Sequence, residues 1–454
     1  MLFLTVNSLV YSQMSPNISF LRSVPQSFAT NPASEVPCRY WIGIPGLSSA
    51  GLSIDNTGFR YKDVFYRTPD DSLHFDVTNF LNTLEKNNYI NVNLNEEILG
   101  FGFNIKAYYF DVRLTDRFSN SIGYSKDLMS FLFRLNGQFI GQTAEFSGTG
   151  LNMTMYHELS LGVRRKFNDT WSGGVRLKCL AGVANIYSRK TDMSLFTDPA
   201  NAYAITVHSD LEINTSIPGT SSDKADSLSF YNYGSKFRKE LSGSLNPGMA
   251  LDLGVQYKLN EKYLFGLSLV DLGFITWKNN PRSYLSDQKN HDYTFEGIDI
   301  NEFIGNDTTT LGNQLQQILD SLSANLGLRT NYDKYTSSLL TRVNLTGQLN
   351  LTEKDHFGAL LQTTLFNKTV KPVLTIHYNH EFGKTLNIMT GYTLSKRNFM
   401  NLALGFSLKL GAFQWYMISD NAYAFFKPTD FRYTNIQLGF NLVFGDKRLL
   451  KKSS

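Results

Sequence analysis

The chain has 454 residues, enough for two or three ordinary domains or for one large barrel. Charged residues make up 18% and aromatic residues 14% of the chain, whereas soluble domains carry about 25% charged residues. The net charge of +4 is too small for a nucleic-acid-binding surface on a chain of this size. The composition therefore excludes a basic nucleic-acid-binding protein and favours a strand-rich chain with aromatic girdles.

The N-terminal segment has the features of a secretory signal. Residues 1–12 form a short, largely apolar segment, and its end at Ser12 resembles a small-residue cleavage site. We interpret residues 1–12 as a signal peptide; an N-terminal hairpin strand is the alternative. Residues 13–39 follow as a periplasmic or hatch segment, because Pro25–Pro37 contains three prolines and cannot form a regular strand. Such a leader either folds into a barrel lumen as a plug or trails in the periplasm.

The body of the chain alternates between apolar and polar residues. In Asn435–Gly445 every second residue is apolar, and the residues between them are mostly amides and glycine. Period-2 alternation places one set on each face of a strand. The same pattern recurs in Met249–Leu259, Leu386–Ser395 and Met400–Gly411. Because the polar faces carry Asn, Gln, Ser, Thr and Gly rather than Lys and Glu, they fit a barrel lumen better than the surface of a soluble sandwich.

The connections between the candidate strands are sorted by length. With both chain ends in the periplasm, that side receives only tight connections: Lys106, Lys166–Thr170, Pro199–Ala202, Asn260-Glu261, Leu351–Lys354, Gly383 and Gly411. The other side receives every long one: 55–93, 122–149, 217–246, 278–333 and 422–430. This asymmetry is typical of bacterial barrels. We predict an all-β, antiparallel, up-and-down transmembrane barrel over residues 40–445, followed by a basic periplasmic tail at 446–454.

The predicted barrel has about fourteen strands. The number rises to sixteen if the weak pair at 191–198 and 203–216 belongs to the wall rather than to an extension outside the membrane. Helical spacing of apolar residues predicts helices in the outer loops at Asp127–Arg134 and Thr310–Leu326. We expect their apolar faces to cap or plug the mouth of the barrel; partner binding is the alternative.

The alternation breaks at Asp271, within the segment Tyr263–Trp277. Strict continuation places this carboxylate against lipid, which costs up to a few kcal/mol at mid-membrane. A bulge at Val270-Asp271 instead turns the side chain inward and shifts the register. The resulting kink either opens a lateral gap or places Asp271 in the lumen; alternatively, the hydrocarbon zone ends before this residue.

Several charged residues are expected to face the lumen together. Arg164, Arg176 and Lys178 share the inward face of one hairpin with Glu158, close to Tyr156, and Asp252 faces inward on a later strand. These residues form either a binding site for an anionic head group or a salt-bridged wall near the periplasmic rim.

No residue set predicts a cofactor, a metal site or a catalytic centre. Two cysteines, Cys38 and Cys179, do not make a disulfide framework or a metal site. His377 and His380 lie three residues apart, so they point to opposite faces of a strand and cannot chelate one ion. No feature links the inward His377 to a nucleophile, so a lumen histidine with a structural role is favoured over a barrel hydrolase.

Three stretches carry a resemblance to a known family. Asn31-Pro32-Ala33, the hairpin His157–Gly182 and the segment Asp252–Trp277 resemble FadL-type outer-membrane barrels, and above all uncharacterised Bacteroidota barrels related to the PorV type. The resemblance covers most of the chain and implies fourteen strands and a hatch formed by Asn31, Pro32 and Ala33. FadL members move hydrophobic compounds, whereas PorV-type members assist protein secretion and surface attachment. A large 278–333 loop and a basic tail depart from FadL and argue against fatty acids as the substrate.

Two functions are compatible with these features. The first is passive transport of a small hydrophobic or amphipathic compound, by capture at the outer loops, passage past a hatch and release through a kinked wall. The second is a non-transporting scaffold that docks secreted or surface proteins on loops 217–246 and 278–333. Both place the protein in the outer membrane of a Gram-negative bacterium, in contact with membrane lipid.

Overall fold

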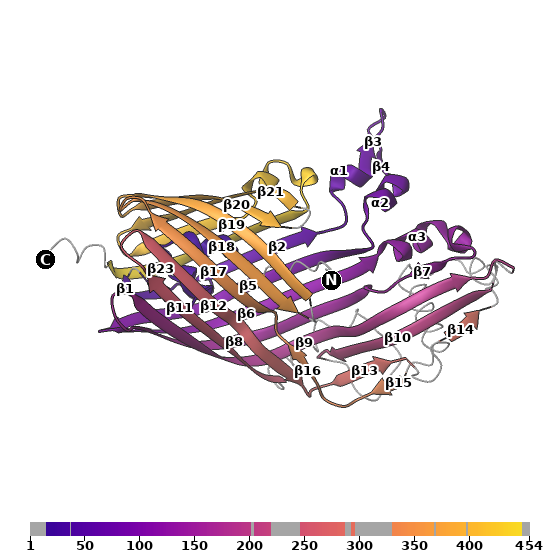
Figure 1. Ribbon diagram of the computed structural model, residues 1–454, viewed down its shortest axis with the longest axis horizontal. Coiled ribbons are helices and arrows are strands. Elements are labelled where there is room, and N and C mark those ends of the chain that lie inside the picture. Colours follow the sequence, from indigo (N-terminus) through magenta and orange to yellow (C-terminus); the bar gives the residue numbers. More distant parts are fainter. Residues whose placement is uncertain are drawn as a thin grey trace.

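The chain forms one large antiparallel sheet that closes on itself (Figure 1). The computed structural model describes residues 15–36, 38–200, 204–218, 246–286, 292–295, 329–366, 369–395 and 398–446. Strands β1 (Cys38–Gly43) and β2 (Ser49–Asn56) lie end to end, and both pair with β5 on one side and β23 on the other. Together they make the first position of the wall.

The remaining wall strands pair with their neighbours in chain order. They are β5 (Asn87–Ile105), β6 (Tyr108–Ser125), β8 (Gly150–Lys166), β9 (Trp171–Thr197), β11 (Asn246–Lys258), β12 (Tyr263–Trp277), β16 and β17 (Tyr335–Ser338 and Thr341–Asn350), β18 (Asp355–Phe366), β19 (Thr369–Phe382), β20 (Leu386–Ser395), β21 (Asn398–Leu410), β22 (Phe413–Ser419) and β23 (Tyr433–Asp446). Since β16 and β17 occupy one position, the described residues form a closed barrel of fourteen strands. This is the lower end of the predicted range.

A sheet extends beyond the barrel from its longest strand. Strand β9 has 27 residues, and β10 (Ile205–Ser216) pairs with its outer half. The short strands β7 (Thr143–Glu145), β13 (Pro281–Leu285), β14 (Asp292–Phe295) and β15 (Arg329–Asn331) widen this extension, which projects to the right in Figure 1. The weak strand pair of the sequence therefore lies outside the wall.

One predicted turn is wrong. Pro199–Ala202 was expected among the periplasmic turns, but β9 runs unbroken from Trp171 to Thr197, so the connection after it lies at the opposite end of the molecule. Arg189 and Lys190 interrupt the alternation and suggested a turn at that point. Instead they pair with acids of β10 across the extension, at 3.0 and 2.9 Å.

The outer face of the wall is apolar, with aromatic residues at the end where the turns are short. Examples are the stacked pair Tyr40–Phe444 and the tilted pair Trp171–Tyr257, whose ring centroids lie 4.8 and 4.7 Å apart. Lys106, with φ of 54°, and Gly411, with φ of 61°, allow tight turns there. A closed antiparallel barrel with an even number of strands, an apolar exterior and sorted turns is the architecture of outer-membrane proteins. The protein is an outer-membrane barrel, and the short turns mark its periplasmic end.

Within the part of the chain that the structure describes, no helix is long and apolar enough to span a membrane.

Short helices lie at the loop end. Helices α1 (Tyr61–Val64) and α2 (Val77–Thr83) flank the hairpin of β3 (Phe65–Arg67) and β4 (Leu73–Phe75), and α3 (Lys126–Arg134) packs against them. The predicted helix at 127–134 is confirmed by α3, which Ser125 caps by accepting a hydrogen bond from the backbone of Leu128 at 3.0 Å. The second predicted helix, at 310–326, lies outside the described residues.

A charge introduced on the lipid-facing side of the wall should destabilise the barrel more than the same charge in an exposed turn. Leu345 is 53% exposed near the middle of β17 and pairs with Leu267 and Leu361. We expect Leu345→Arg to lower the free energy of unfolding in lipid vesicles by about 2–4 kcal/mol, because it places a charge in hydrocarbon. Glu353→Arg in an exposed turn is the matched control and should change it by less than about 0.5 kcal/mol. Equal effects would contradict the orientation of β17.

Candidate functional site

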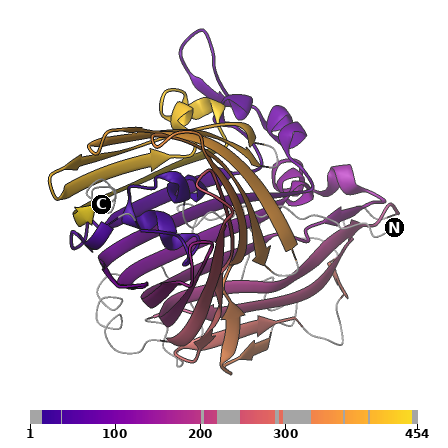
Figure 2. The same ribbon diagram turned by 60° about the vertical axis from the view of Figure 1, so that its left-hand side comes forward.

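The N-terminal segment fills the periplasmic half of the lumen. Residues 15–36 form two short 3-10 helices, η1 (Pro16–Phe20) and η2 (Pro25–Ala29), inside the wall, seen as the indigo coil within the barrel in Figure 2. We call these residues the plug. Almost all of them are buried.

Hydrogen bonds hold the plug to opposite sides of the barrel. Gln26 donates to Glu97 of β5 at 2.9 Å, and Gln414 of β22 donates to the carbonyl of Ser23 at 2.8 Å. On the other side, Asn344 donates to the carbonyl of Thr30 at 2.9 Å. A straight path along the barrel axis is therefore occupied by protein at this level.

The predicted hatch residues lie against three glycines of the wall. Asn31 is 2% exposed, accepts a hydrogen bond from the backbone of Ala33 at 2.9 Å and donates to the carbonyl of Val255 at 3.3 Å. A Cβ at Gly174 would overlap the carbonyl of Pro32, and one at Gly254 would overlap the Asn31 amide. The third glycine, Gly266, leaves room for the amide nitrogen of Asn31. The wall is thus shaped to receive this turn.

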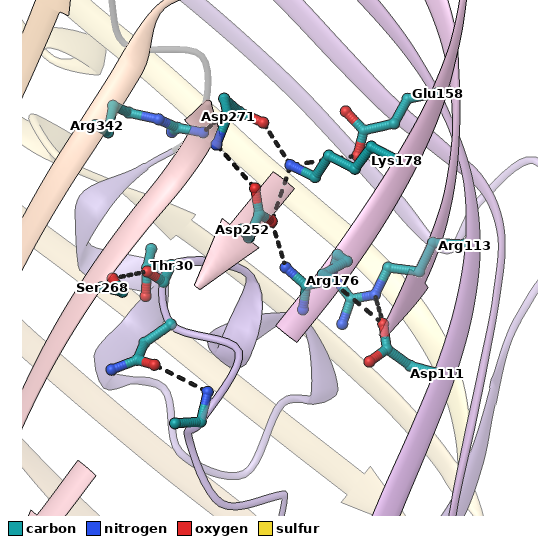
Figure 3. Close-up of polar contacts among 12 residues, drawn as sticks. Thr30, Asp111, Arg113, Glu158, Arg176, Lys178, Asp252, Ser268, Asp271 and Arg342 are labelled. Carbon is teal, nitrogen blue, oxygen red and sulfur yellow. Dashed lines mark hydrogen bonds and ion pairs between the residues drawn. The ribbon is translucent and has the colours of Figure 1, made fainter. Parts of the chain in front are cut away.

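Most of the predicted lumen charges meet in one network, part of which is drawn in Figure 3. Its members come from the seven strands β5, β6, β8, β9, β11, β12 and β17. Arg176 pairs with Asp252 at 3.0 Å and lies 3.6 Å from Asp111; Lys178 pairs with Asp252 at 2.9 Å and also with Asp271. The network continues from Asp271 to Arg342.

The network continues onto strands β5, β6 and β8. Arg113 joins Asp111 to Glu97, both at 3.3 Å, and Arg117 pairs with Glu158 at 2.8 Å. Five acids face five bases, and every member is at most 8% exposed: Glu97, Asp111, Glu158, Asp252 and Asp271 with Arg113, Arg117, Arg176, Lys178 and Arg342. We call this network the charge belt.

The bulge explains how Asp271 joins the belt. Asp271 has a φ of 61°, and the register between β11 and β12 shifts beside it. Val270 and Asp271 are both 1% exposed, while Leu272 faces outward at 48%. The backbone of Asp271 donates to Asp252 at 2.8 Å. The bulge does not part the strands, because Leu339 donates to the carbonyl of Gly273 at 2.9 Å.

Two predicted residues lie apart from the belt. Arg164 donates to the carbonyl of Ala33 at 2.7 Å and so holds the plug. His377 faces the lumen, where its ring lies 3.4 Å from the ring of Phe20 and neither nitrogen has a hydrogen-bond partner among the described residues. A second inward histidine, His356, was missed; its Nδ1 accepts a hydrogen bond from Arg22 at 3.0 Å. Tyr156 lies inward beside the belt and is 2% exposed.

The opposite half of the lumen contains an apolar cluster. Ile18, Phe20, Leu21 and Val24 of the plug pack against inward residues of β18 and β20–β22: Leu360, Met389, Ala403, Tyr416 and Ile418. The other inward residues of these strands are mostly polar, such as Gln362, Asn387 and Asn401. Outside the same strands, an apolar groove of about 740 Å³ opens toward lipid, lined by Phe265, Leu349, Phe357 and Ile376 among others.

The wall is interrupted beyond the end of β22 that lies away from the periplasmic turns. This strand has 7 residues, whereas β21 has 13 and β23 has 14. Pairing of β22 stops at Leu404 of β21 and Gln437 of β23, so among the described strands the upper parts of β21 and β23 have no partner on this side. Seven residues tilted by about 40° rise roughly 18 Å, which is less than the roughly 25 Å apolar band of such barrels.

A short turn closes this notch. The 3-10 helix η5 (Ala422–Phe425) lies against β21 and β23, with Ala422 and Ala424 buried and Phe425 exposed at 53%. We call the gap between β21 and β23 with this turn the lateral notch. Asn421 donates to the carbonyl of Tyr433 at 2.8 Å and attaches the turn to β23.

The lateral notch is tied to the plug through one buried carboxylate. Asp420 is 1% exposed and accepts hydrogen bonds from Asn17 at 2.7 Å and from Ser15, the first described residues of the plug. It also accepts from Asn435 at 2.7 Å and Tyr433 at 3.0 Å in β23. The same side chain thus contacts plug, turn and wall.

Comparison with known proteins gives a family. Residues 32–420 match the model of a family described as "Family of unknown function (DUF5723)". The chain belongs to this family. No curated protein matches the chain.

Similar solved structures are barrels of the type that the sequence resembles. The Ralstonia pickettii toluene transporter TbuX has 8% identity and a TM-score of 0.42, with 95% of this chain and 94% of that chain covered. The Pseudomonas putida toluene transporter TodX has 9% identity and a TM-score of 0.42, covering 96% and 98%. A Pseudomonas aeruginosa FadL homologue has 10% identity and a TM-score of 0.41, covering 94% and 95%. The architecture of this DUF5723 member rests on its own strand pairing, not on these scores.

The plug predicts a conductance phenotype. We expect Gly174→Val to displace the Asn31–Ala33 turn, because the new side chain overlaps the carbonyl of Pro32. Planar-bilayer conductance of the purified variant should rise severalfold over the wild type. Gly347→Val, where the nearest atom to an added Cβ is 3.9 Å away, should conduct like the wild type. An unchanged conductance in Gly174→Val would contradict this seating of the plug.

The charge belt predicts a rescue pattern. Asp271→Asn leaves Lys178 and Arg342 without their shared buried partner, so it should destabilise the barrel by about 3–5 kcal/mol. Adding Arg342→Gln should recover more than half of the loss. Asp210→Asn, in the exposed pair with Lys190, should cost at most about 1 kcal/mol. Chemical unfolding in vesicles measures all three, and an additive double variant would contradict the pairing.

Proposed function

We propose that the protein is a passive route for a small hydrophobic or amphipathic compound that leaves the lumen sideways through the lateral notch. The observation that carries this proposal is the interruption of the wall above β22, where a turn instead of a strand separates the lumen from lipid. Irregular backbone at membrane depth needs polar partners from the protein. Here the Asn421 amide donates to the carbonyl of Tyr433, and the Asn435 amide oxygen accepts from the backbone of Asp420.

The blocked axis supports a sideways exit. The plug is bonded to strands around the barrel, and the charge belt fills the lumen beside it. A compound that enters from the loop end therefore meets protein on the straight path. Moving the turn aside requires no loss of strand pairing, since η5 is not part of the sheet.

The two-sided lumen supports the substrate class. The inner side of the wall near the notch carries the apolar Ala403 and Ile418 beside the polar Thr393 and Asn401, and its outer side is apolar. The other half of the lumen carries the belt. A compound with an apolar part can contact the apolar cluster on this side, whereas an ion would have to leave water. This arrangement also accommodates an amphipathic compound with its polar end toward the belt.

The notch replaces the exit that the sequence suggested. A gap beside Asp271 was one expectation, but the strands stay joined there. For the alternative scaffold function, the loops that would dock a protein lie mainly outside the described residues, and no contact within the described ranges favours it.

Uptake of a lipophilic probe tests the proposal. Cells with the protein in their outer membrane should take up N-phenyl-1-naphthylamine severalfold faster than cells with an empty vector, as followed by its fluorescence. Asp420→Ala frees the turn from the plug and should raise the rate further. Asp430→Asn, in the same loop and ion-paired only with the exposed Lys62 among the described residues, is the matched control and should match the wild type. Uptake equal to the empty vector, at equal surface expression, would refute the transport function.

A further inference from the structure

The charge belt encloses a small cavity against the plug. Its free volume for the centre of a water molecule is about 20 Å³, and Ala29 of the plug forms one side. A volume of this size holds one or two waters or a single monatomic ion. The cavity shares no lining residue with the apolar cluster on the other side of the lumen or with the lateral notch.

The lining of the cavity carries an excess of positive charge. Its bases are Arg113, Arg117, Arg176, Lys178 and Arg342, and its acids are Glu97 and Glu158. The remaining three acids of the belt approach these bases from outside the lining. The belt as a whole is neutral, but the cavity faces five cationic and two anionic side chains.

Several buried donors at the cavity lack an acceptor. At least one guanidinium nitrogen in each of four lining arginines has no hydrogen-bond partner among the described residues: Nε and Nη2 of Arg113, Nη1 of Arg117, Nε and Nη2 of Arg176, and Nε of Arg342. All four residues are at most 8% exposed. Leaving such a donor unpaired costs about 1–3 kcal/mol or more for a charged group.

We infer that the cavity binds one small monatomic anion of the halide class, such as chloride. One water can donate its two hydrogens to Asn95 Oδ1 and Ser160 Oγ, the unpartnered lining acceptors within the described residues, but it then accepts from only two of the unpartnered guanidinium nitrogens. A halide only accepts. Phosphate, sulfate or a carboxylate exceeds the available volume.

The bound anion stabilises the seated plug. Phe28 stacks on the guanidinium groups of Arg113 and Arg176, whose carbons lie 4.1 and 5.7 Å from its ring centroid. Its neighbour Ala29 closes the cavity. Since the anion fixes the same arginines on which the plug rests, anion binding and plug seating favour each other. This inference does not depend on the transport function.

The full-length protein in detergent provides the test. Crystals grown in bromide should show one anomalous peak between Arg117 and Arg176. The unfolding temperature should be about 2 °C higher in chloride or bromide than in gluconate at equal ionic strength, with saturation as halide rises. Absence of the peak together with equal unfolding temperatures would overturn the inference, as would bromide bound only elsewhere.

Two variants separate the cavity from general salt effects. Ala29→Leu fills the cavity without changing a charge and should abolish both the peak and the halide dependence. Arg117→Gln with Glu158→Gln removes a lining pair while keeping the belt neutral, and should weaken halide binding at least tenfold. Arg60→Gln with Asp63→Asn, an ion pair in an outer loop, should keep the wild-type response. Halide dependence that persists in both cavity variants would contradict this site.

Discussion

Every backbone group within the hydrocarbon layer needs a partner inside the protein, and this requirement shapes the whole molecule. It explains why β23 returns to pair with both β1 and β2 and closes the sheet. It also explains the construction of the lateral notch, where β22 ends early. There the side-chain amides of Asn421 and Asn435 bond the carbonyl of Tyr433 and the backbone N–H of Asp420, groups that a longer strand would have paired.

The interior is built from two unlike halves, and the plug matches both. Toward the belt it presents Phe28, whose ring packs on two guanidinium groups, and Thr30, whose carbonyl accepts from Ser268 at 2.6 Å. Toward β18–β22 it presents Ile18, Phe20 and Leu21. Because each half would be costly to expose to the other, the orientation of the plug about the barrel axis is fixed.

The sequence predicts those features that each strand decides alone. Asp271 could be placed inward because a carboxylate in lipid is costly, and the bulge follows from that constraint. Asp252, Arg176 and Lys178 face the lumen by simple alternation. The pairing among them needed the register between neighbouring strands, which a single sequence does not supply.

Features that depend on relations between strands were missed. Arg189 and Lys190 suggested a turn because the sequence does not show that β9 leaves the membrane and continues in water. Asp111, Arg113 and Arg342 alternate inward like many polar residues, so nothing singled them out until they met across the lumen. The early end of β22 was missed as well, because its length relative to β21 and β23 shows only when the three strands are paired.

Asp420 couples the plug to the lateral notch. Its hydrogen bonds from Ser15 and Asn17 form only when the start of the plug lies beneath the notch, and its bonds from Tyr433 and Asn435 hold the turn against β23. A displacement of the plug therefore removes two of the groups that solvate this buried carboxylate, which weakens the position of the turn. The reverse also holds, because the coupling between two sites is reciprocal. The plug and the lateral notch thus behave as one unit, although Asn17 and Asp420 lie 403 residues apart in the chain.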